Sequence, residues 1–225
     1  IGILPGKRKS SLPNQVDGAL ESFGMSMGPF RMMDLVGLDL GWRARKLAKI
    51  ETPLANKISD ALCEQERFGQ KTSKGFYNYS EGSRAPNPAP ENESIYKEMS
   101  DQNNIERREI SDQEIVDRCI LALVNEGARI LDEGVAQRSG DMDIVYINGY
   151  GFPIWRGGPM FYANQLGLSE VINKMNAFSE LDDNFWKPAP LLKKLADESG
   201  AFGEAPAPDE RSELLSFKKA NMGGV

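Results

Sequence analysis

The sequence contains no histidine among its 225 residues. Histidine is the side chain best suited to proton transfer near neutral pH, so its absence excludes most Ser–His, Cys–His and zinc-dependent mechanisms. Only two cysteines are present, Cys63 and Cys119. They lie far apart, which argues against a disulfide framework and favours a reducing compartment. Cys119 falls in an apolar helical pattern and is expected to be a core thiol. We therefore expect no metal site and no catalytic residue in this chain.

Long apolar runs are also missing, since none approaches the ~20 residues that a membrane-spanning helix needs. The formal net charge of −6 disfavours a nucleic-acid partner. Residues 1–10 are basic but lack the apolar segment of a signal peptide. The C-terminal residues, Gly-Gly-Val, do not match the Ser-Lys-Leu type of peroxisomal signal, which favours a bacterial cytoplasm over a peroxisome.

What is present indicates an all-α protein. Residues 14–23 are expected to form a helix that ends at Gly24, and Gly28-Pro29 is expected to begin another that ends at Gly37. Further helices are expected over residues 40–50, 59–68, 169–178 and 188–198, with Ser59 and Ser169 as N-caps. There is little β signal, and the β-branched residues 144–147 occupy a place where the first half of the chain has a helix.

The clearest predicted helix covers residues 111–133. Ser111 and Glu114 have the spacing of a capping box, in which two side chains satisfy free backbone amides at the helix start. Apolar residues follow at helical spacing on two adjacent stripes, which predicts burial on most sides. Gly134 ends the pattern.

Four segments follow from these patterns. We predict a first helical domain at residues 11–80 and a linker at 81–110, which is polar throughout and rich in Pro, Ser, Asn and Gly at its start. A second helical domain is predicted at residues 111–200, and a tail at 201–225.

An internal repeat relates the two predicted domains. Residues 28–38 read GPFRMMDLVGL and residues 158–168 read GPMFYANQLGL, so that Gly-Pro opens both segments, Gly-Leu closes both, and Asp34 aligns with Asn164. Upstream, residues 16–17 align with residues 142–143 if the second copy has a few extra residues around 150–155. Duplication of one helical unit is the favoured explanation, and a chance match is the alternative.

The first copy lacks an opening helix like the one that precedes the second copy. Residues 1–15 contain Pro5, Gly6 and Pro13 and are too short for it. We therefore expect this chain to be a fragment of a longer protein, with exposed apolar surface that association would cover. The alternative is that the first copy never had this helix.

Two motifs resemble those of 3-hydroxyacyl-CoA dehydrogenase C-terminal domains. They are residues 16–39, around MGPF and DLVGLD, and residues 68–77, FGQKTSKGFY. Residues 149–163, GYGFPIWRGGPMFYA, resemble the second copy of this domain in multifunctional β-oxidation enzymes. These enzymes join enoyl-CoA hydratase, dehydrogenase and a tandem C-terminal region, and the closest resemblance is to the peroxisomal-type bifunctional enzymes and their bacterial relatives.

The resemblance implies a parent enzyme that binds NAD in a Rossmann domain. That enzyme transfers hydride from C3 of an L-3-hydroxyacyl-CoA to NAD, while a histidine accepts the hydroxyl proton. None of these functional residues carries over, because the chain has no histidine and no G-x-G-x-x-G dinucleotide motif. Asn125 does not match the position of the family's helix asparagine. We therefore predict no dehydrogenase or hydratase activity for this chain alone.

The resemblance also implies that this region forms one wall of the acyl-CoA cleft and an interface that imitates a dimer. The candidate wall residues are Gly28, Pro29, Phe30 and Asp34, because a helix N-terminus offers free amides to substrate oxygens. Helix capping and core packing are the alternative roles for these four residues. A further hypothesis is that Lys71 or Lys74 contacts a CoA phosphate. The alternative is that these lysines belong to a turn with a purely structural role.

The favoured function is thus the scaffold and cleft-wall region of an NAD-dependent dehydrogenase, whose partners would be the missing Rossmann and hydratase domains and, through them, acyl-CoA. Homo-oligomers are compatible with this function. One alternative is an autonomous helical interaction or oligomerisation module without a catalytic role. Another is a truncated chain with no independent function.

Overall fold

The computed structural model describes residues 8–9, 12–106 and 109–203, and it confirms the prediction of a helical fold. The first half contains α1 (Pro13–Phe23), α2 (Pro29–Val36), α3 (Asp39–Ala48), α4 (Lys57–Glu64) and α5 (Glu93–Gln102). The second half contains α6 (Asp112–Asp132), α7 (Ser139–Tyr150), α8 (Pro159–Leu166), α9 (Leu168–Ala177), α10 (Asp183–Trp186) and α11 (Pro190–Asp197). Within the described ranges, no helix is long and apolar enough to cross a bilayer.

Short elements connect these helices. Single 3-10 turns lie at Leu54–Asn56, Gln70–Thr72, Pro90–Asn92 and Ile154–Arg156, and are named η1 to η4. Strands β1 (Arg8–Lys9) and β4 (Ile105–Glu106) pair in parallel, and β2 (Asn78–Tyr79) pairs antiparallel with β3 (Pro86–Asn87). Each of these strands is two residues long, so each two-stranded sheet joins two loop segments by a short backbone pairing.

Most predicted helix ends are confirmed. Gly24 ends α1 with a φ of 119°, a left-handed conformation that glycine adopts without steric cost. The Ser111 hydroxyl accepts a hydrogen bond from the Glu114 amide at the start of α6. The predictions for Ser59 and Ser169 were wrong, because α4 begins two residues before Ser59 and α9 begins one residue before Ser169. The Ser59 hydroxyl instead donates to the Asn56 carbonyl.

The predicted linker differs from the structure in its second part. Residues 93–102 form α5, and this helix packs on α4. Ile95 is 5% exposed and belongs to the core of the first half, together with Leu62 and Phe76. Apolar residues are sparse in this polar segment, so the pattern along the chain did not reveal a helix that is held by a few tertiary contacts.

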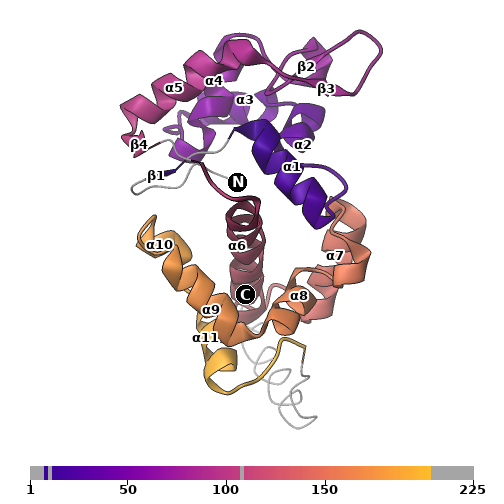
Figure 1. The fold of residues 1–225 in the computed structure, drawn as a ribbon, viewed down its shortest axis with the longest axis vertical. Helices are drawn as coiled ribbons and strands as arrows, with labels where there is room; N and C mark the ends of the chain where they lie inside the picture. The colour runs from indigo at the N-terminus through magenta and orange to yellow at the C-terminus, as the bar shows by residue number, and fades with distance from the viewer. Residues whose placement is uncertain (1–7, 10–11, 107–108, 204–225) are drawn as a thin grey trace, which may run out of the picture.

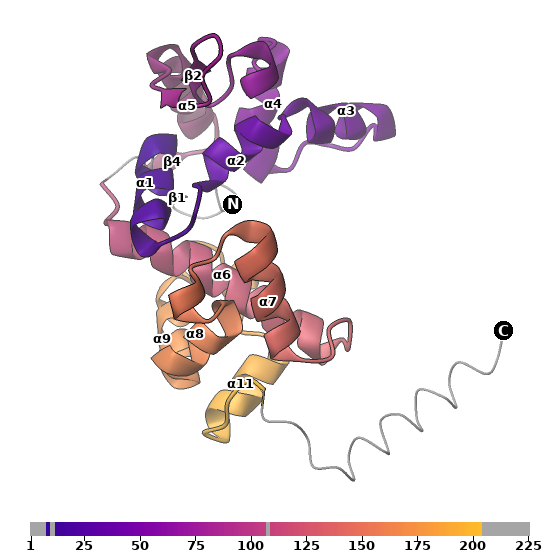
Figure 2. The same cartoon turned by 90° about the vertical axis from the view of Figure 1, so that its right-hand side faces the viewer.

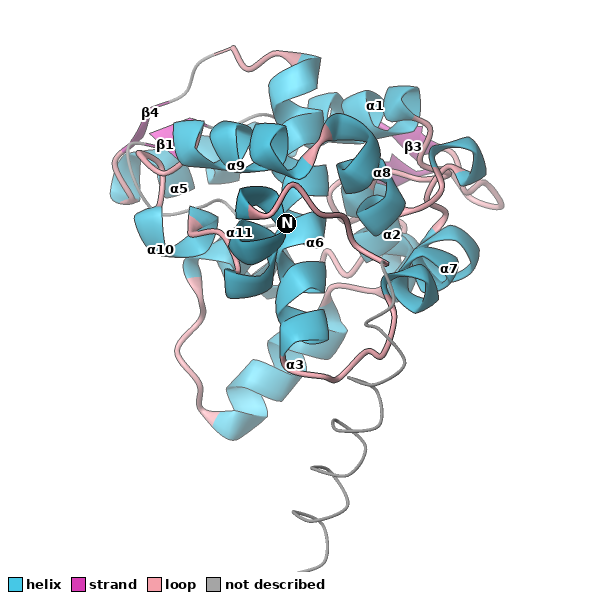
Figure 3. Ribbon diagram, turned by 90° about the horizontal axis from the view of Figure 1, so that it is seen from below, coloured by secondary structure: helices cyan, strands magenta, loops and turns pink. Residues whose placement is uncertain are grey.

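Helix α6 runs through the middle of the molecule, with α1–α5 above it and α7–α11 around and below it in Figure 1. Figure 3, seen from below, shows the same central position. The N-terminal half of α6 buries Ile115, Val116 and Ile120 in one apolar cluster with α1. From Leu121 onward the helix buries Leu121, Val124 and Ala128 in a second cluster. One long helix therefore supplies core residues to both halves, which explains its burial on most sides.

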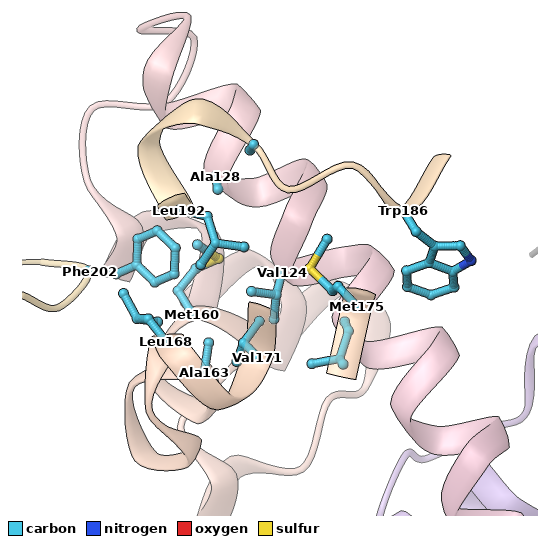
Figure 4. Close-up of a cluster of buried hydrophobic side chains, with 12 residues drawn as sticks. Val124, Ala128, Met160, Ala163, Leu168, Val171, Met175, Trp186, Leu192 and Phe202 are labelled. Carbon is cyan, nitrogen blue, oxygen red and sulfur yellow. The ribbon is translucent and has the colours of Figure 1, made fainter. Parts of the chain in front are cut away.

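The second cluster is the core of the second half (Figure 4). Its members come from α6, α8, α9, α10 and α11, and from the segments that flank α11. Trp186 and Leu192 are 1% and 0% exposed. The other buried members are Leu121, Val124, Ala128, Met160, Ala163, Leu168, Val171, Met175, Ala189 and Phe202.

A separate set of contacts joins the two halves beside α6. The Arg156 guanidinium donates to the Phe23 carbonyl at 3.0 Å, and it lies 4.0 Å from the centre of the Phe23 ring. The Ser26 amide donates to the Gly151 carbonyl at 2.9 Å. The Phe23 ring also packs edge-on against Phe152. The residues that the second copy has in excess over the first, around 150–155, therefore form part of the junction between the halves.

Candidate functional site

The amides at the start of α2 are hydrogen-bonded within the chain. The carboxylate of Asp17, on α1, accepts from the Phe30 amide at 2.9 Å and from the Arg31 amide at 3.0 Å. Glu21 accepts from the Gly28 amide at 3.0 Å. These are the groups that the sequence suggested for substrate oxygens, and a carboxylate already occupies the positive end of the helix.

Gly28 and Pro29 have local reasons to be where they are. A Cβ atom at Gly28 would lie 2.3 Å from Cβ of Asp17, so only glycine permits this approach of α1 to α2. Pro29 occupies the first helical position, where no amide is needed. Phe30 is half-buried, and its ring meets the Phe76 ring at 4.7 Å. These contacts favour the capping and packing roles of the three residues.

Asp34 lies at the centre of a buried polar network in the first half and is 1% exposed. Its carboxylate accepts from the Phe76 amide at 2.9 Å, from the Tyr77 amide at 3.0 Å and from the Tyr79 hydroxyl at 2.9 Å. The Tyr77 hydroxyl in turn donates to Asp17 at 2.7 Å. Asp34 therefore fixes the closing segment 75–79 against α1 and α2.

The second half repeats the hydrogen bonds that Asp17 makes at the start of α2. The Asp143 carboxylate accepts from the Met160 amide at 2.8 Å and from the Phe161 amide at 3.1 Å, as Asp17 does in the first half. The sequence separation is 17 residues from Asp143 to Met160 and 13 from Asp17 to Phe30, so the second copy has four more residues. The hydrogen bonds support the alignment of residues 16–17 with 142–143.

Asn164 takes the place of Asp34 in the second half. Its side-chain amide donates to the Phe202 carbonyl at 2.8 Å and accepts from the Phe202 amide at 2.9 Å. An amide can donate and accept, whereas a carboxylate only accepts. The chain at Phe202 is thus held by a neutral side chain. In the first half, the closing segment is held by the Asp34 carboxylate and three donors.

Sequence reasoning missed the capping role of Asp17 and Asp143. The signal was present, because both copies have an aspartate before Gly-Pro, 11 residues before it in the first copy and 15 in the second. It also missed Arg67, which is 5% exposed and donates to the Gly75 carbonyl, Asn78 and Glu91. No local pattern marks Arg67, because its partners become neighbours only when the chain folds.

Burial changes the protonation behaviour of these groups. It raises the pKa of Asp17, Asp34 and Asp143, against the opposing effect of the hydrogen bonds that each carboxylate accepts. Burial also raises the pKa of the Tyr77 and Tyr79 hydroxyls, with the neighbouring carboxylates adding to the effect. Both tyrosines therefore stay protonated and act as hydrogen-bond donors.

A pH dependence follows from the raised carboxyl pKa values. A carboxyl group whose pKa is higher in the folded state binds a proton more readily there, so its contribution to stability grows as pH falls towards that pKa and is lost as pH rises through it. We expect the stability advantage of the wild-type chain over Asp143→Asn to increase between pH of about 7 and about 5. Urea unfolding at both pH values measures this change, and a constant or decreasing advantage would contradict it.

Both cysteines have the properties of structural thiols. Cys63 is buried, and desolvation raises its pKa to about 12. Cys119 packs at the edge of the cluster shared by α1 and α6, and desolvation raises its pKa to about 11. The reactive form of cysteine is the thiolate, so neither residue has the depressed pKa of a nucleophile. The described residues contain no group of three or more potential ligands arranged for a metal ion.

The lysines proposed for a CoA phosphate lie in the turn before Gly75. Lys71 is paired with Asp39, and this contact lowers the pKa of the Asp39 carboxyl. Lys74 is exposed, and its backbone pairs with Gly69. An open depression of about 400 Å³ lies elsewhere in the first half. It is lined by Glu51, Thr52, Pro53, Leu54, Lys57 and Asn103 and contains none of the predicted substrate residues.

Solved structures share this fold. The dehydrogenase part of multifunctional enzyme 1 from C. elegans superposes with a TM-score of 0.65 at 32% identity, over 82% of this chain and 42% of that one. The 3-hydroxybutyryl-CoA dehydrogenase of Escherichia coli superposes with a TM-score of 0.60 at 18% identity, over 84% of this chain and 55% of that one. The second likeness concerns the fold alone.

Sequence relatives agree with this result. The chain is 40% identical to the peroxisomal bifunctional enzyme of Danio rerio over 93% of its own length and 31% of that protein. It is 36% identical to the fatty acid oxidation complex subunit alpha of Vibrio campbellii, over 84% of its own length and 26% of that protein. The chain thus spans about a third of the length of these relatives. The family model of the 3-hydroxyacyl-CoA dehydrogenase C-terminal domain matches residues 7–79 of this chain.

Proposed function

We propose that this chain is the helical scaffold region of an NAD-dependent L-3-hydroxyacyl-CoA dehydrogenase, within a multifunctional enzyme of fatty-acid β-oxidation. The observation that carries the proposal is the family match at residues 7–79, together with relatives that are named as bifunctional, multifunctional or fatty-acid-oxidation proteins. In this role the chain holds a wall of the acyl-CoA cleft and an interface between domains. Residues 11–80 and 111–200 would be the two related units.

The chemistry of the dehydrogenase would come from parts of the enzyme outside this chain. The chain has no histidine to accept the hydroxyl proton, and no G-x-G-x-x-G motif to bind the NAD pyrophosphate. Its residues therefore do not fit a dinucleotide site, and no step of the reaction is assigned to them. Its partners would be the Rossmann and hydratase domains of the same enzyme, and acyl-CoA through them.

The roles proposed for individual residues are narrower than the sequence suggested. Asp34 is buried and fully engaged, so we propose that it shapes the cleft wall by holding the closing segment. Phe30 is only partly buried and is the favoured contact with an acyl chain. The relatives include peroxisomal, glyoxysomal and bacterial proteins, and we propose the bacterial cytoplasm as the location.

Complementation tests this function. The chain alone is expected to show no oxidation of an L-3-hydroxyacyl-CoA, whereas mixing it with a separately produced NAD-binding domain should restore NADH formation. The NAD-binding domain alone is the control. A stable monomeric chain that neither binds this domain in light scattering nor restores activity would instead support the autonomous interaction module.

A further inference from the structure

Helices α3 and α9 are equivalent in the repeat, because each of them comes at the end of the segment that the two copies share. Four neighbouring positions of α9, two of which pack in the core of the second half, are occupied by the neutral residues Ile172, Asn173, Met175 and Asn176. In the register of the repeat, the same positions of α3 are occupied by Trp42, Arg43, Arg45 and Lys46. The first half thus has an aromatic ring and three cations that the shared fold does not require.

The aromatic and cationic side chains of α3 meet the segment that follows α4. The centre of the Phe68 ring lies 5.9 Å from the centre of the Trp42 ring. The Arg43 guanidinium carbon and the Lys71 ammonium nitrogen lie 5.9 Å and 5.8 Å from the centre of the same Phe68 ring. The Lys46 ammonium lies 4.0 Å over the Trp42 ring. We call these residues, Trp42, Arg43, Lys46, Phe68 and Lys71, the cation–aromatic cluster.

The cation–aromatic cluster has an excess of positive charge at its surface. Arg43 and Lys71 share one carboxylate, that of Asp39. Lys46 pairs with Glu64 at 2.8 Å, so three cations face two carboxylates. The side chains of Arg43 and Lys71 are 67% and 46% exposed, whereas that of Asp39 is 6% exposed. The carboxylate therefore lies beneath the two cations, which can offer their remaining N–H donors to an anion from solvent.

The helix that carries most of the cluster is held firmly and is accessible. Figure 2 shows α3 at the side of the first half, beyond α2 and α4. The indole N–H of Trp42 donates to Glu64 at 3.1 Å, and the Arg45 guanidinium donates to Asp60 at 3.2 Å, so two contacts fix α3 on α4. Trp42 and Phe68 are only partly buried. A planar base can stack on aromatic rings of this kind, and phosphates can bind the cations beside them.

The cluster lies at the opposite end of α2 from the proposed acyl contact. Phe30 is in the first turn of α2, whereas a Cβ atom at Gly37, directly after the last turn, would lie 3.0 Å from Nζ of Lys71. A helix of eight residues is about 12 Å long. A ligand that has its apolar end at Phe30 therefore needs an extended arm to bring an anionic group to the cluster. Acyl-CoA has an acyl chain, a pantetheine arm and a phosphorylated adenosine in this order.

We propose that the cation–aromatic cluster binds the phosphorylated adenosine of acyl-CoA, with the base on the rings of Trp42 and Phe68 and the phosphates on Arg43 and Lys71. The inference rests on the proposed function, and it names the part of the substrate that this chain holds. The chain has a net charge of −6, so a local excess of cations is the feature that attracts a phosphorylated ligand to this surface.

Isothermal titration calorimetry on the whole chain measures this binding. Free CoA and its nucleotide fragment, 3′-phospho-ADP, are the probes, and we expect saturable binding of both but not of pantetheine. Arg43→Gln and Lys71→Gln should each weaken CoA binding at least about fivefold, because each removes a charge-assisted contact to a phosphate. Lys97→Gln is the matched control, because Lys97 is exposed on α5 and lies outside the cluster. This substitution should leave the CoA affinity unchanged.

Three results would overturn the inference. The first is that CoA does not bind to the chain, and the second is that Arg43→Gln and Lys71→Gln bind CoA as tightly as the wild type. In either case, the packing of α3 on the first half is the role of the cluster. The third is that inorganic pyrophosphate binds as tightly as 3′-phospho-ADP, because the rings of Trp42 and Phe68 then take no part.

The complementation experiment separates this inference from the proposed function. In the restored enzyme, Arg43→Gln and Lys71→Gln should raise the KM for an L-3-hydroxyacyl-CoA and leave the KM for the matching pantetheine thioester unchanged. Restored NADH formation with neither KM altered would reject the nucleotide site and leave the scaffold function in place. CoA binding without complementation would retain the nucleotide site and count against the scaffold function.

Discussion

Replacing Asp34 by alanine is expected to destabilise the first half of the molecule by about 3–5 kcal/mol. The carboxylate accepts three hydrogen bonds, from the Phe76 and Tyr77 amides and from the Tyr79 hydroxyl. Alanine leaves these buried donors without a partner, and an unsatisfied buried amide costs about 1–3 kcal/mol. The closing segment 75–79 should then separate from α2.

Asp34→Asn is the informative companion variant. The second half uses Asn164 at the equivalent position, but there the amide faces one donor and one acceptor of Phe202. At position 34 the carboxylate has three donors as partners, so the NH₂ group of asparagine would face another donor. We expect asparagine to be destabilising but less so than alanine, because its oxygen still accepts from part of the network.

Hydrogen exchange followed by mass spectrometry localises the effect. In Asp34→Ala the amides of residues 68–79 and of α2 should lose protection first, while those of α8, α9 and α11 keep it. Urea unfolding gives the free energy. Equal protection in both halves, or a loss below about 1 kcal/mol, would mean that the Asp34 network does not hold the first half together.

Substituting Val124 by aspartate is expected to unfold the second half, with a cost above about 4 kcal/mol. Val124 is 0% exposed in the cluster shown in Figure 4. A carboxylate placed there would be surrounded by the apolar side chains of the cluster, and it would protonate or expel the neighbouring helices. Far-ultraviolet circular dichroism and urea unfolding measure the loss.

The same change at Ile120, one turn earlier on α6, should act on a different contact. Ile120 is 1% exposed and belongs to the cluster with α1, so aspartate should release α1 from α6. Hydrogen exchange should then show the main loss in α1 for Ile120→Asp and in α8, α9 and α11 for Val124→Asp. Val135→Asp is the exposed control and should stay within about 0.5 kcal/mol of the wild type. Identical patterns for the two core variants would show that α6 does not serve two separable cores.

Local signals in the sequence determined most helices and the repeat. Proline at the first turn and glycine after the last turn mark α2 in the first copy and α8 in the second. These residues act through their own backbone geometry, so their effect can be recognised from the local sequence. The apolar stripes of α6 predicted its burial on most sides for a similar reason. A pattern with a period of 3.6 residues can be read along the chain without knowing the neighbours.

Tertiary contacts decided the rest. Helix α5 lies in a polar segment and is held by packing on α4, so its position depended on residues distant in sequence. The partners of Arg67 and the occupied amides of α2 also became visible only in the fold. The sequence by itself determined that the chain has a repeated helical unit and lacks a histidine and a dinucleotide motif. Only the tertiary structure decided that the Gly28-Pro29 turn is capped from within and that α6 serves both halves, because burial and hydrogen-bond partners depend on which distant segments meet.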